Sequence, residues 1–213
     1  MDVYRTEEEQ VEVIRAWWRE NGRSAVFGVA LGLAAIFGWR AWQAYEVAQA
    51  EAASALYQEM MDAVHAGKSA DAAKSGERLA LEQAGSAYAV FARLALAGLA
   101  MDAKDLDAAA EHLRLALARN EVPALEPEIR LRLARVLTAQ GEFDAALAQI
   151  AAPAAAEGYG AAAEELRGDI ESLRGNPDAA RDAYQKARSR SSPASADELL
   201  ELKLDSLGAR ADS

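Results

Sequence analysis

The sequence of 213 residues contains no cysteine. This excludes a disulfide framework, a zinc site built from thiolates and a cysteine nucleophile. Histidine is almost as scarce, because only His65 and His112 occur, in separate helical stretches. Neither has a second ligand at the spacing of metal sites, so we interpret both as ordinary helix residues, exposed or half-buried. We expect no metal and no cofactor.

The chain also lacks the two-residue alternation of Val, Ile and Thr that indicates β-strands. Alanine is the commonest residue and β-branched residues are sparse, so helix propensity is high along nearly the whole length. Short breaks interrupt the helical pattern at residues 65–67, 84–86, 104–105, 123–127, 141, 153–160, 175–177 and 191–193. Such short connections require antiparallel neighbours, and the predicted fold class is all-α.

The chain has fewer basic than acidic side chains, 23 against 34. The formal net charge is -11, and residues 41–213 hold 18 basic and 28 acidic side chains, a net of -10. A nucleic-acid-binding protein needs a basic stripe to neutralise phosphates, so nucleic acid is not an expected partner. We interpret the acidity of this large C-terminal part as a solvated surface that keeps the domain soluble.

One long run does lack charge. Residues 24–39 are uncharged and lie between Arg23 and Arg40, with Trp39 and Trp42 where a helix would leave a bilayer. We predict a membrane-spanning helix over about residues 24–45. Two alternatives are a buried core helix and a signal peptide cleaved near residues 48–50, where Ala-Gln-Ala resembles a cleavage site.

The basic residues around this run predict its orientation. Four arginines precede the span and only Arg40 follows it closely, so the N-terminus is expected in the cytosol and the large domain outside, in the periplasm of a bacterium. The expected parts are a cytosolic amphipathic segment 1–22, a transmembrane helix 23–45 and a periplasmic repeat domain 46–213. Gly28 and Gly32 form a small-xxx-small pair that permits close approach of another transmembrane helix.

The cytosolic segment has a pattern of its own. Thr6 and Glu9 have the spacing of a capping box. Four apolar residues cluster on one face of a short helix that we expect to end near Asn21 and Gly22: Val11, Ile14, Trp17 and Trp18. This helix is expected to lie along the inner membrane surface.

The C-terminal part shows a period of thirty-four residues, which is that of tetratricopeptide repeats. Gly141, Ala146 and Ile150 recur as Gly175, Ala180 and Tyr184. Each repeat is predicted to be a helical hairpin whose helices approach where small residues meet, namely Ala97, Ala134 and Gly168 against Ala109, Ala146 and Ala180. Helices ending near residues 65 and 82, and the leucine-rich residues 197–207, are expected to cap the array.

Taken together, the chain resembles the YfgM family, the ancillary subunit of the bacterial SecYEG translocon. The resemblance is carried by residues 10–22, Gly38-Trp39-Arg40, residues 131–136 and residues 166–169. It implies a single-pass inner-membrane protein that associates with the translocon and with the membrane-anchored chaperone PpiD, and that helps exported polypeptides pass to periplasmic chaperones.

A tetratricopeptide array binds partners in its concave face, which the first helix of each hairpin lines. The repeat register points eight residues toward this face: Phe91, Leu94, Met101, Glu128, Leu131, Arg135, Glu165 and Asp169. The first three would form an apolar end suited to an apolar segment. In the alternative interpretation, Phe91, Leu94 and Met101 pack under the N-terminal capping helices.

No pattern in the sequence indicates catalysis. The chain has no Gly-rich phosphate loop, no serine in an elbow motif and no histidine with spaced carboxylates, so we predict a binding protein and no enzyme. Two other functions stay open: an organiser of the cell envelope or of cell division, and a stress-response regulator. An organiser usually carries a coiled-coil segment, and no sustained heptads follow residue 45.

Overall fold

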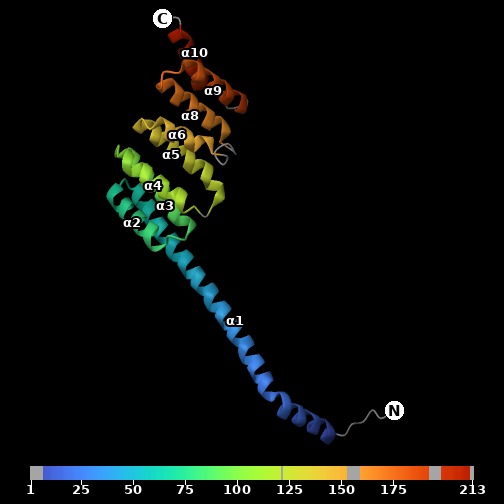
Figure 1. Cartoon of the computed structure of the whole chain (residues 1–213). Helices are drawn as coiled ribbons and strands as arrows, with labels where there is room; N and C mark the ends of the chain where they lie inside the picture. The colour runs from blue at the N-terminus through green and yellow to red at the C-terminus, as the bar shows by residue number, and fades with distance from the viewer. Residues whose placement is uncertain (1–6, 121, 153–158, 192–197, 212–213) are drawn as a thin grey trace. The chain divides into compact units, whose positions relative to one another are not determined.

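The computed structural model of the chain describes residues 7–120, 122–152, 159–191 and 198–211, and all regular structure in these ranges is helical. The all-α prediction is confirmed (Figure 1). The elements are α1 (Glu7–His65), α2 (Ser69–Glu82), α3 (Ala87–Asp102), α4 (Leu106–Ala118), the 3-10 turn η1 (Pro123–Leu125), α5 (Glu126–Gln140), α6 (Phe143–Ala151), α8 (Gly160–Leu173), α9 (Pro177–Arg190) and α10 (Glu198–Ala211).

Helix α1 is continuous over 59 residues, so the predicted helix end near Asn21 and Gly22 is wrong. A single glycine inside a helix costs only about 1 kcal/mol, which does not end a helix without a left-handed turn or a proline after it. Contacts within the helix also surround this position. The Asn21 amide donates to the Trp17 carbonyl at 3.3 Å, and the Trp18 indole covers Gly22. Thr6, of the predicted capping box, lies outside the described residues.

The chain divides into two compact units, Met1–Glu51 and Ala52–Ser213. In the described part of the first unit, the regular structure is the N-terminal part of α1, and the second unit holds the remaining helices. The expected limits after residues 22 and 45 both fall inside α1, so the helix itself marks neither limit. These limits stay predictions.

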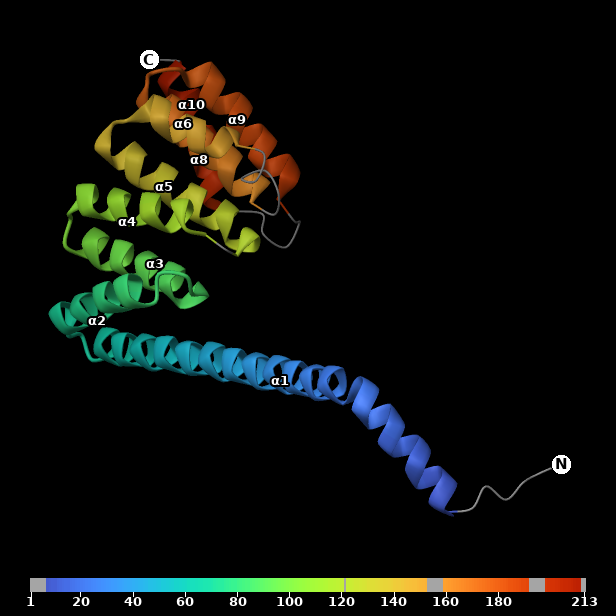
Figure 2. The ribbon, with the colours of Figure 1, turned by 60° about the horizontal axis from the view of Figure 1, so that its bottom comes forward.

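The second unit is a stack of helical hairpins. Helices α3 and α4, α5 and α6, and α8 and α9 pack as pairs, and α4 packs on α5 as α6 packs on α8 (Figures 1 and 2). This is the predicted repeat. The six small residues that we expected between paired helices are all buried: Ala97, Ala109, Ala134, Ala146, Gly168 and Ala180.

The turns of the three hairpins use the same backbone conformation. Gly141 and Gly175 both have a φ of 80°, and Lys104 has a φ of 62° at the corresponding place of the first hairpin. This left-handed conformation ends the first helix of each pair and suits glycine, which has no Cβ. The turns thus confirm the predicted breaks at residues 104–105 and 141, and the third break at residues 175–176, since Pro177 already begins α9.

Other breaks are narrower than predicted. Residues 123–127 were expected to form one break, but η1 fills residues 123–125 and Pro127 lies in the first turn of α5. Proline fits there because the first turn of a helix needs no backbone N–H from it. Gly160, at the end of another predicted break, begins α8. Pro153 and Pro193 lie outside the described residues.

The array is capped at both ends. The C-terminal part of α1 packs with α2 and α3 through Ala53, Met60, Leu79 and Ala92, which are buried together. At the other end, Leu200 and Leu207 of α10 are buried against α9 and Leu204 packs beside them.

Two of the five leucines expected to form the C-terminal cap do not pack. Leu199 is 53% exposed and Leu202 is 64% exposed. Residues 200, 204 and 207 follow the helical spacing of i, i+4 and i+7, so they share one face. Residue 199 falls about 100° to one side of that face and residue 202 falls on the opposite side of the helix, so both stay on the surface.

Candidate partner-binding surface and membrane anchor

The eight residues predicted to line the concave face come from three helices. Helix α3 carries Phe91, Leu94 and Met101, helix α5 carries Glu128, Leu131 and Arg135, and helix α8 carries Glu165 and Asp169. The structure gives these three groups different surroundings.

The predicted apolar end is largely covered. The Phe91 ring lies 6.2 Å from the ring of Tyr57 on α1, and Tyr57 lies 5.5 Å from Tyr88. Leu94 packs against the main buried cluster of the repeats. Met101 is different, because it is 40% exposed. The alternative interpretation, packing at the N-terminal cap, therefore describes Phe91, whereas Met101 stays accessible to a partner.

The central group is mostly polar. Leu131 is only 2% exposed and belongs to the main core, so the prediction that it lines the binding face is wrong. Its position on α5 turns it toward the core and leaves no apolar surface for a partner. Glu128 accepts a hydrogen bond from Arg132 at 2.6 Å, and its carboxylate raises the pKa of the Tyr159 hydroxyl. Arg135 is exposed.

The two predicted residues on α8, Glu165 and Asp169, are paired with Lys203 of α10. Lys203 donates to Glu165 at 2.6 Å and to Asp169 at 3.0 Å, and Tyr184 donates its hydroxyl hydrogen to Asp169 at 2.8 Å. Burial opposes the charge of Lys203, but hydrogen bonds to both carboxylates raise its pKa overall. Burial and the bond to Asp169 raise the pKa of Tyr184 as well. A partner would have to displace Lys203 to reach these carboxylates.

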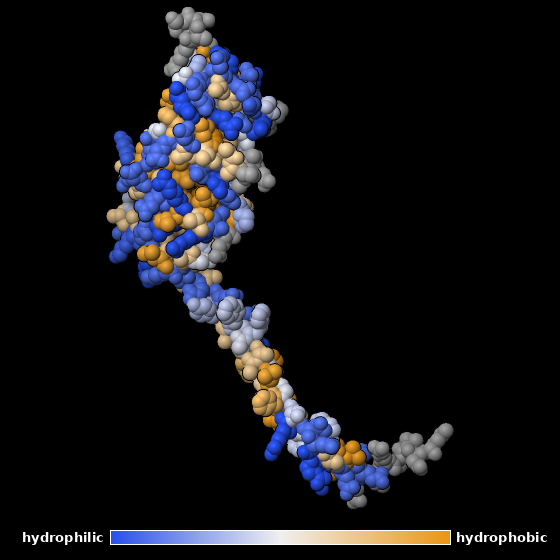
Figure 3. All heavy atoms as spheres, viewed as in Figure 1, coloured by the Kyte–Doolittle hydropathy of each residue, from blue (hydrophilic) through white to orange (hydrophobic). Residues whose placement is uncertain are grey.

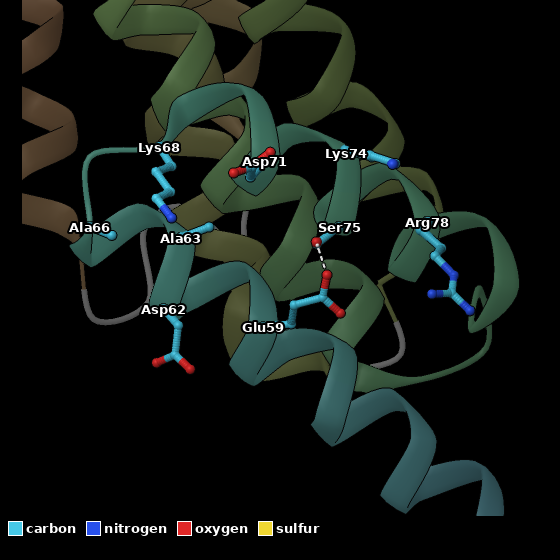
Figure 4. Close-up of a pocket in the computed structure, with 9 residues that line it drawn as sticks. All are labelled: Glu59, Asp62, Ala63, Ala66, Lys68, Asp71, Lys74, Ser75 and Arg78. Carbon is cyan, nitrogen blue, oxygen red and sulfur yellow. Dashed lines mark hydrogen bonds between the residues drawn. The ribbon is translucent and has the colours of Figure 1, made fainter.

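Sequence reasoning missed a polar groove of about 530 Å³ between the C-terminal part of α1 and α2 (Figure 4). Inside it, the Ser75 hydroxyl donates to Glu59 at 2.8 Å. The groove mixes three cations with three carboxylates and is lined by Glu59, Asp62, Ala63, Ala66, Lys68, Asp71, Lys74, Ser75 and Arg78. The lining includes no histidine that could activate Ser75. No periodic signal in the sequence indicated this groove, because its polar residues occupy ordinary surface positions of two helices.

In the part of the chain that the structure describes, no three His, Cys, Asp or Glu residues converge as they would around a metal ion. The carboxylates that do cluster, such as Glu165 and Asp169, are bridged by Lys203. The exposed surface of the repeat domain combines mixed charges with a few apolar side chains, such as Met101 and Leu173.

Helix α1 carries the apolar segment predicted to span a membrane. It is long and apolar enough to cross a bilayer, and the most apolar stretch of eighteen residues has none of its residues buried. Figure 3 shows hydrophobic side chains gathered along the middle of α1. Trp39 is 65% exposed and Trp42 is 59% exposed. Among the described residues, nothing packs over this stretch of α1, which favours a membrane-spanning helix over the alternative of a buried core helix.

The two glycines of the small-xxx-small pair are open in the same way. A Cβ carbon at Gly28 or at Gly32 would meet nothing within 4 Å. Nothing on α1 itself requires glycine at these positions. Close approach of a second helix stays a prediction.

Comparison with known proteins gives the family. The family described as a tetratricopeptide repeat-like domain matches residues 15–209. The chain is 38% identical over 147 residues to the ancillary SecYEG translocon subunit of Escherichia coli K12, covering 69% of this chain and 70% of that protein. It is 33% identical to the protein of the same name from Haemophilus influenzae, covering 68% of this chain and 70% of that protein.

A third relative extends the similarity to nearly the whole chain. The ancillary SecYEG translocon subunit of Aggregatibacter actinomycetemcomitans is 28% identical over 201 residues, which are 94% of this chain and 97% of that protein. The aligned length is long enough to include both the apolar N-terminal segment and the repeats of this chain. The chain belongs to the YfgM-like family of tetratricopeptide repeat-like proteins, whose curated relatives carry the name ancillary SecYEG translocon subunit.

Proposed function

We propose that this chain is a membrane-anchored, protein-binding subunit at the SecYEG translocon. The observation that carries the proposal is the 38% identity to a translocon subunit over more than two thirds of both chains. Helix α1 supports it, because its uncovered apolar stretch suits a bilayer. The N-terminus lies in the cytoplasm and the repeat domain in the periplasm. With a PpiD-like membrane-anchored chaperone, the domain helps newly exported polypeptides pass to periplasmic chaperones.

Co-purification tests the partner. The full chain with a C-terminal affinity tag is solubilised from bacterial membranes in mild detergent, and the captured proteins are identified by mass spectrometry. We expect the translocon subunits and a PpiD-like chaperone. Recovery of peptidoglycan synthases without the translocon would contradict the proposal and favour the cell-envelope organiser.

Single-cysteine labelling tests the orientation, because the natural chain has no cysteine to interfere. Ala16 and Ala103 are both exposed, on the two sides of the span. In spheroplasts, a membrane-impermeant maleimide should label Ala103→Cys at once and Ala16→Cys only after lysis. The reverse order would place the repeat domain in the cytoplasm and overturn the proposal.

Met101 is the exposed residue of the predicted apolar end, so it is the sharpest test of that surface. We expect Met101→Glu to lower recovery of the PpiD-like chaperone about tenfold, because a charge would then face an apolar segment. Leu173→Glu is the matched control, since Leu173 is an exposed leucine on α8 outside the predicted set. Unchanged recovery with Met101→Glu would move the binding site elsewhere.

The anchor is tested separately. Replacing Gly28 and Gly32 with Leu keeps the span apolar and blocks close approach of another transmembrane helix. Ala30 and Ala34 lie on the opposite side of the helix, so the same replacement there is the matched control. Loss of translocon subunits with the first pair alone would assign part of the binding to the anchor. Equal recovery of translocon subunits with both pairs of variants would show that Gly28 and Gly32 do not contribute to binding.

A further inference from the structure

The N-terminal part of α1 exposes an apolar face before the candidate span begins. Five large apolar side chains between residues 11 and 18 are each more than half exposed: Val11, Val13, Ile14, Trp17 and Trp18, at 51%, 55%, 65%, 52% and 57%. Exposed apolar residues scattered singly are common, but five in eight positions are not. This face needs a covering.

The five side chains share one side of the helix. At about 100° per residue, they fall within one half of the circumference, and Gly22 falls at its edge. The other half carries the charged residues Glu9, Glu12, Arg15, Arg19, Glu20 and Arg23. Residues 9–22 are thus an amphipathic helix whose charged residues all lie outside the apolar half, which also contains the uncharged polar residues Gln10 and Asn21.

The position of this helix shows what can cover it. α1 continues without a break into the uncharged residues 24–39, so the bilayer begins within one turn of Gly22. The N-terminal, blue part of α1 is bent relative to the helix that follows it within the first unit (Figure 2). Gly22 is the first glycine of α1, and glycine restrains the helix backbone less than other residues do.

The side chains at this junction suit the border of a membrane. Trp18 lies over Gly22, where a Cβ carbon would be 3.3 Å from three atoms of the indole. Tryptophan favours the headgroup level, where its apolar ring and its N–H both find suitable surroundings. Arg15, Arg19 and Arg23 lie on the polar half, from which they can reach lipid phosphates.

We propose that residues 9–22 form an interfacial helix whose exposed apolar face lies in the headgroup region of the lipid bilayer, next to the span. The occupant of the face is lipid, because the face is continuous with the membrane segment. The proposal rests on α1 crossing the bilayer. It adds a second, surface-bound contact with the membrane, which sets the height and rotation of the span.

Tryptophan fluorescence of the full chain in phospholipid vesicles tests the proposal. The chain has four tryptophans, so Trp39→Phe with Trp42→Phe leaves Trp17 and Trp18 as reporters. The probes are phospholipids with bromine near the headgroup or near the chain end. Insertion of about 5–10 Å predicts roughly a twofold loss of emission with the shallow bromine and a smaller loss with the deep one. If neither brominated lipid quenches the emission of Trp17 and Trp18, while acrylamide dissolved in the water does, the proposal would be overturned.

The complementary variant separates this proposal from the anchor itself. Trp17→Phe with Trp18→Phe leaves Trp39 and Trp42, which report on the span. Quenching of this variant by brominated lipid, together with no quenching of Trp17 and Trp18, keeps the anchor and refutes the interfacial helix. No quenching of either variant refutes the anchor and the inference together.

Charge placement provides the matched control. In the background with Trp17 and Trp18, Ile14→Glu puts a charge in the apolar face and should remove most of the quenching by the shallow bromine. Ala16 is exposed on the polar half, so Ala16→Glu should leave the quenching unchanged. Equal loss in both variants would show that net charge, and not the apolar face, controls the contact.

Discussion

The ring of Tyr184 on α9 lies directly against the backbone of Gly168 on α8. A Cβ carbon at position 168 would be 2.3 Å from Cε1 of that ring, closer than van der Waals contact permits. The ring cannot easily retreat, because the Tyr184 hydroxyl is bonded to Asp169 at 2.8 Å and Lys203 lies 5.7 Å from the ring centre. The small residue of the third repeat thus makes room for an aromatic ring, whereas the sequence predicted that Gly168 would meet the small residue Ala180.

This contact predicts that Gly168→Ala lowers the stability of the repeat domain. Overpacking costs about 1–3 kcal/mol, and a Cβ only 2.3 Å from a ring that is held in place belongs to the upper part of this range, above the gain of about 1 kcal/mol in helix propensity. The measurement is urea unfolding of the fragment Ala52–Ser213, which contains the whole repeat core. In the control Gly98→Ala, a Cβ would meet nothing within 4 Å, so this variant should be as stable as the parent or more stable. Equal behaviour of the two variants would contradict the Tyr184 contact.

The second hairpin has its own close approach. Ala146 is fully buried, so we expect Ala146→Leu to cost about 1–3 kcal/mol by forcing α5 and α6 apart. Its neighbour Ala145 is exposed on the same helix, and Ala145→Leu should change the free energy of unfolding by less than about 0.5 kcal/mol. Thermal unfolding of the same fragment checks both, and an unchanged melting temperature for Ala146→Leu would refute the repeat register.

Lys203 holds the C-terminal cap in place. We expect Lys203→Ala to lower the stability of the α10 region by about 1–3 kcal/mol, because Glu165 and Asp169 would lose their shared cation. Hydrogen exchange measured by mass spectrometry should then be faster in α10, while α3 and α4 keep their protection.

The matched control for Lys203 is an exposed ion pair. Lys186 and Asp182 are bonded at 2.6 Å on the surface of α9, with the Lys186 side chain 51% exposed. Because such pairs contribute at most about 1 kcal/mol, Lys186→Ala should leave the exchange of α10 unchanged. Unchanged exchange in Lys203→Ala as well would remove the structural role that we assign to this lysine.

The pH dependence of stability should carry a contribution from His112. Burial lowers its pKa, and Arg93, whose guanidinium lies 3.1 Å from Nδ1, acts in the same direction. The carboxylates of Glu77, Glu111 and Asp105 oppose this effect without reversing it. The unfolded chain therefore binds a proton to His112 more readily than the folded one.

The sign of the effect follows from this difference. The contribution of neutral His112 to stability is fully present above its unfolded pKa of about 6.5 and is lost as the pH falls below that value toward the lower folded pKa. We expect His112→Gln to flatten the free energy of unfolding over this acidic window. His65 is exposed, so His65→Gln serves as control, and the same flattening in both variants would count against His112.

The limits of prediction are visible in particular residues. Leu131 has the repeat position of a groove residue, but only the packing of α5 against its neighbours shows that it is buried. Glu165 and Asp169 look like free surface carboxylates in the sequence. Their cation, Lys203, is 34 to 38 positions away, and no local pattern connects them.

Helix ends show the same division between local and distant causes. Gly141 and Gly175 could be read as helix ends because a left-handed turn is a property of one residue and its neighbours. Asn21 and Gly22 were also predicted to end a helix, but α1 continues through them, with the side chain of Trp18 over Gly22. The same residue type gave two outcomes, and the surrounding side chains made the difference.

The sequence by itself determined the all-helical class, the period of thirty-four residues, the small residues between paired helices and the apolar segment of α1. These depend on spacing along the chain and on helix propensity, which are local quantities. Only the tertiary structure decided which residues predicted for the concave face are covered, how Lys203 holds α10, and that the Tyr184 ring lies against Gly168. These depend on contacts between residues far apart in the chain, whose partners are set by how the hairpins stack.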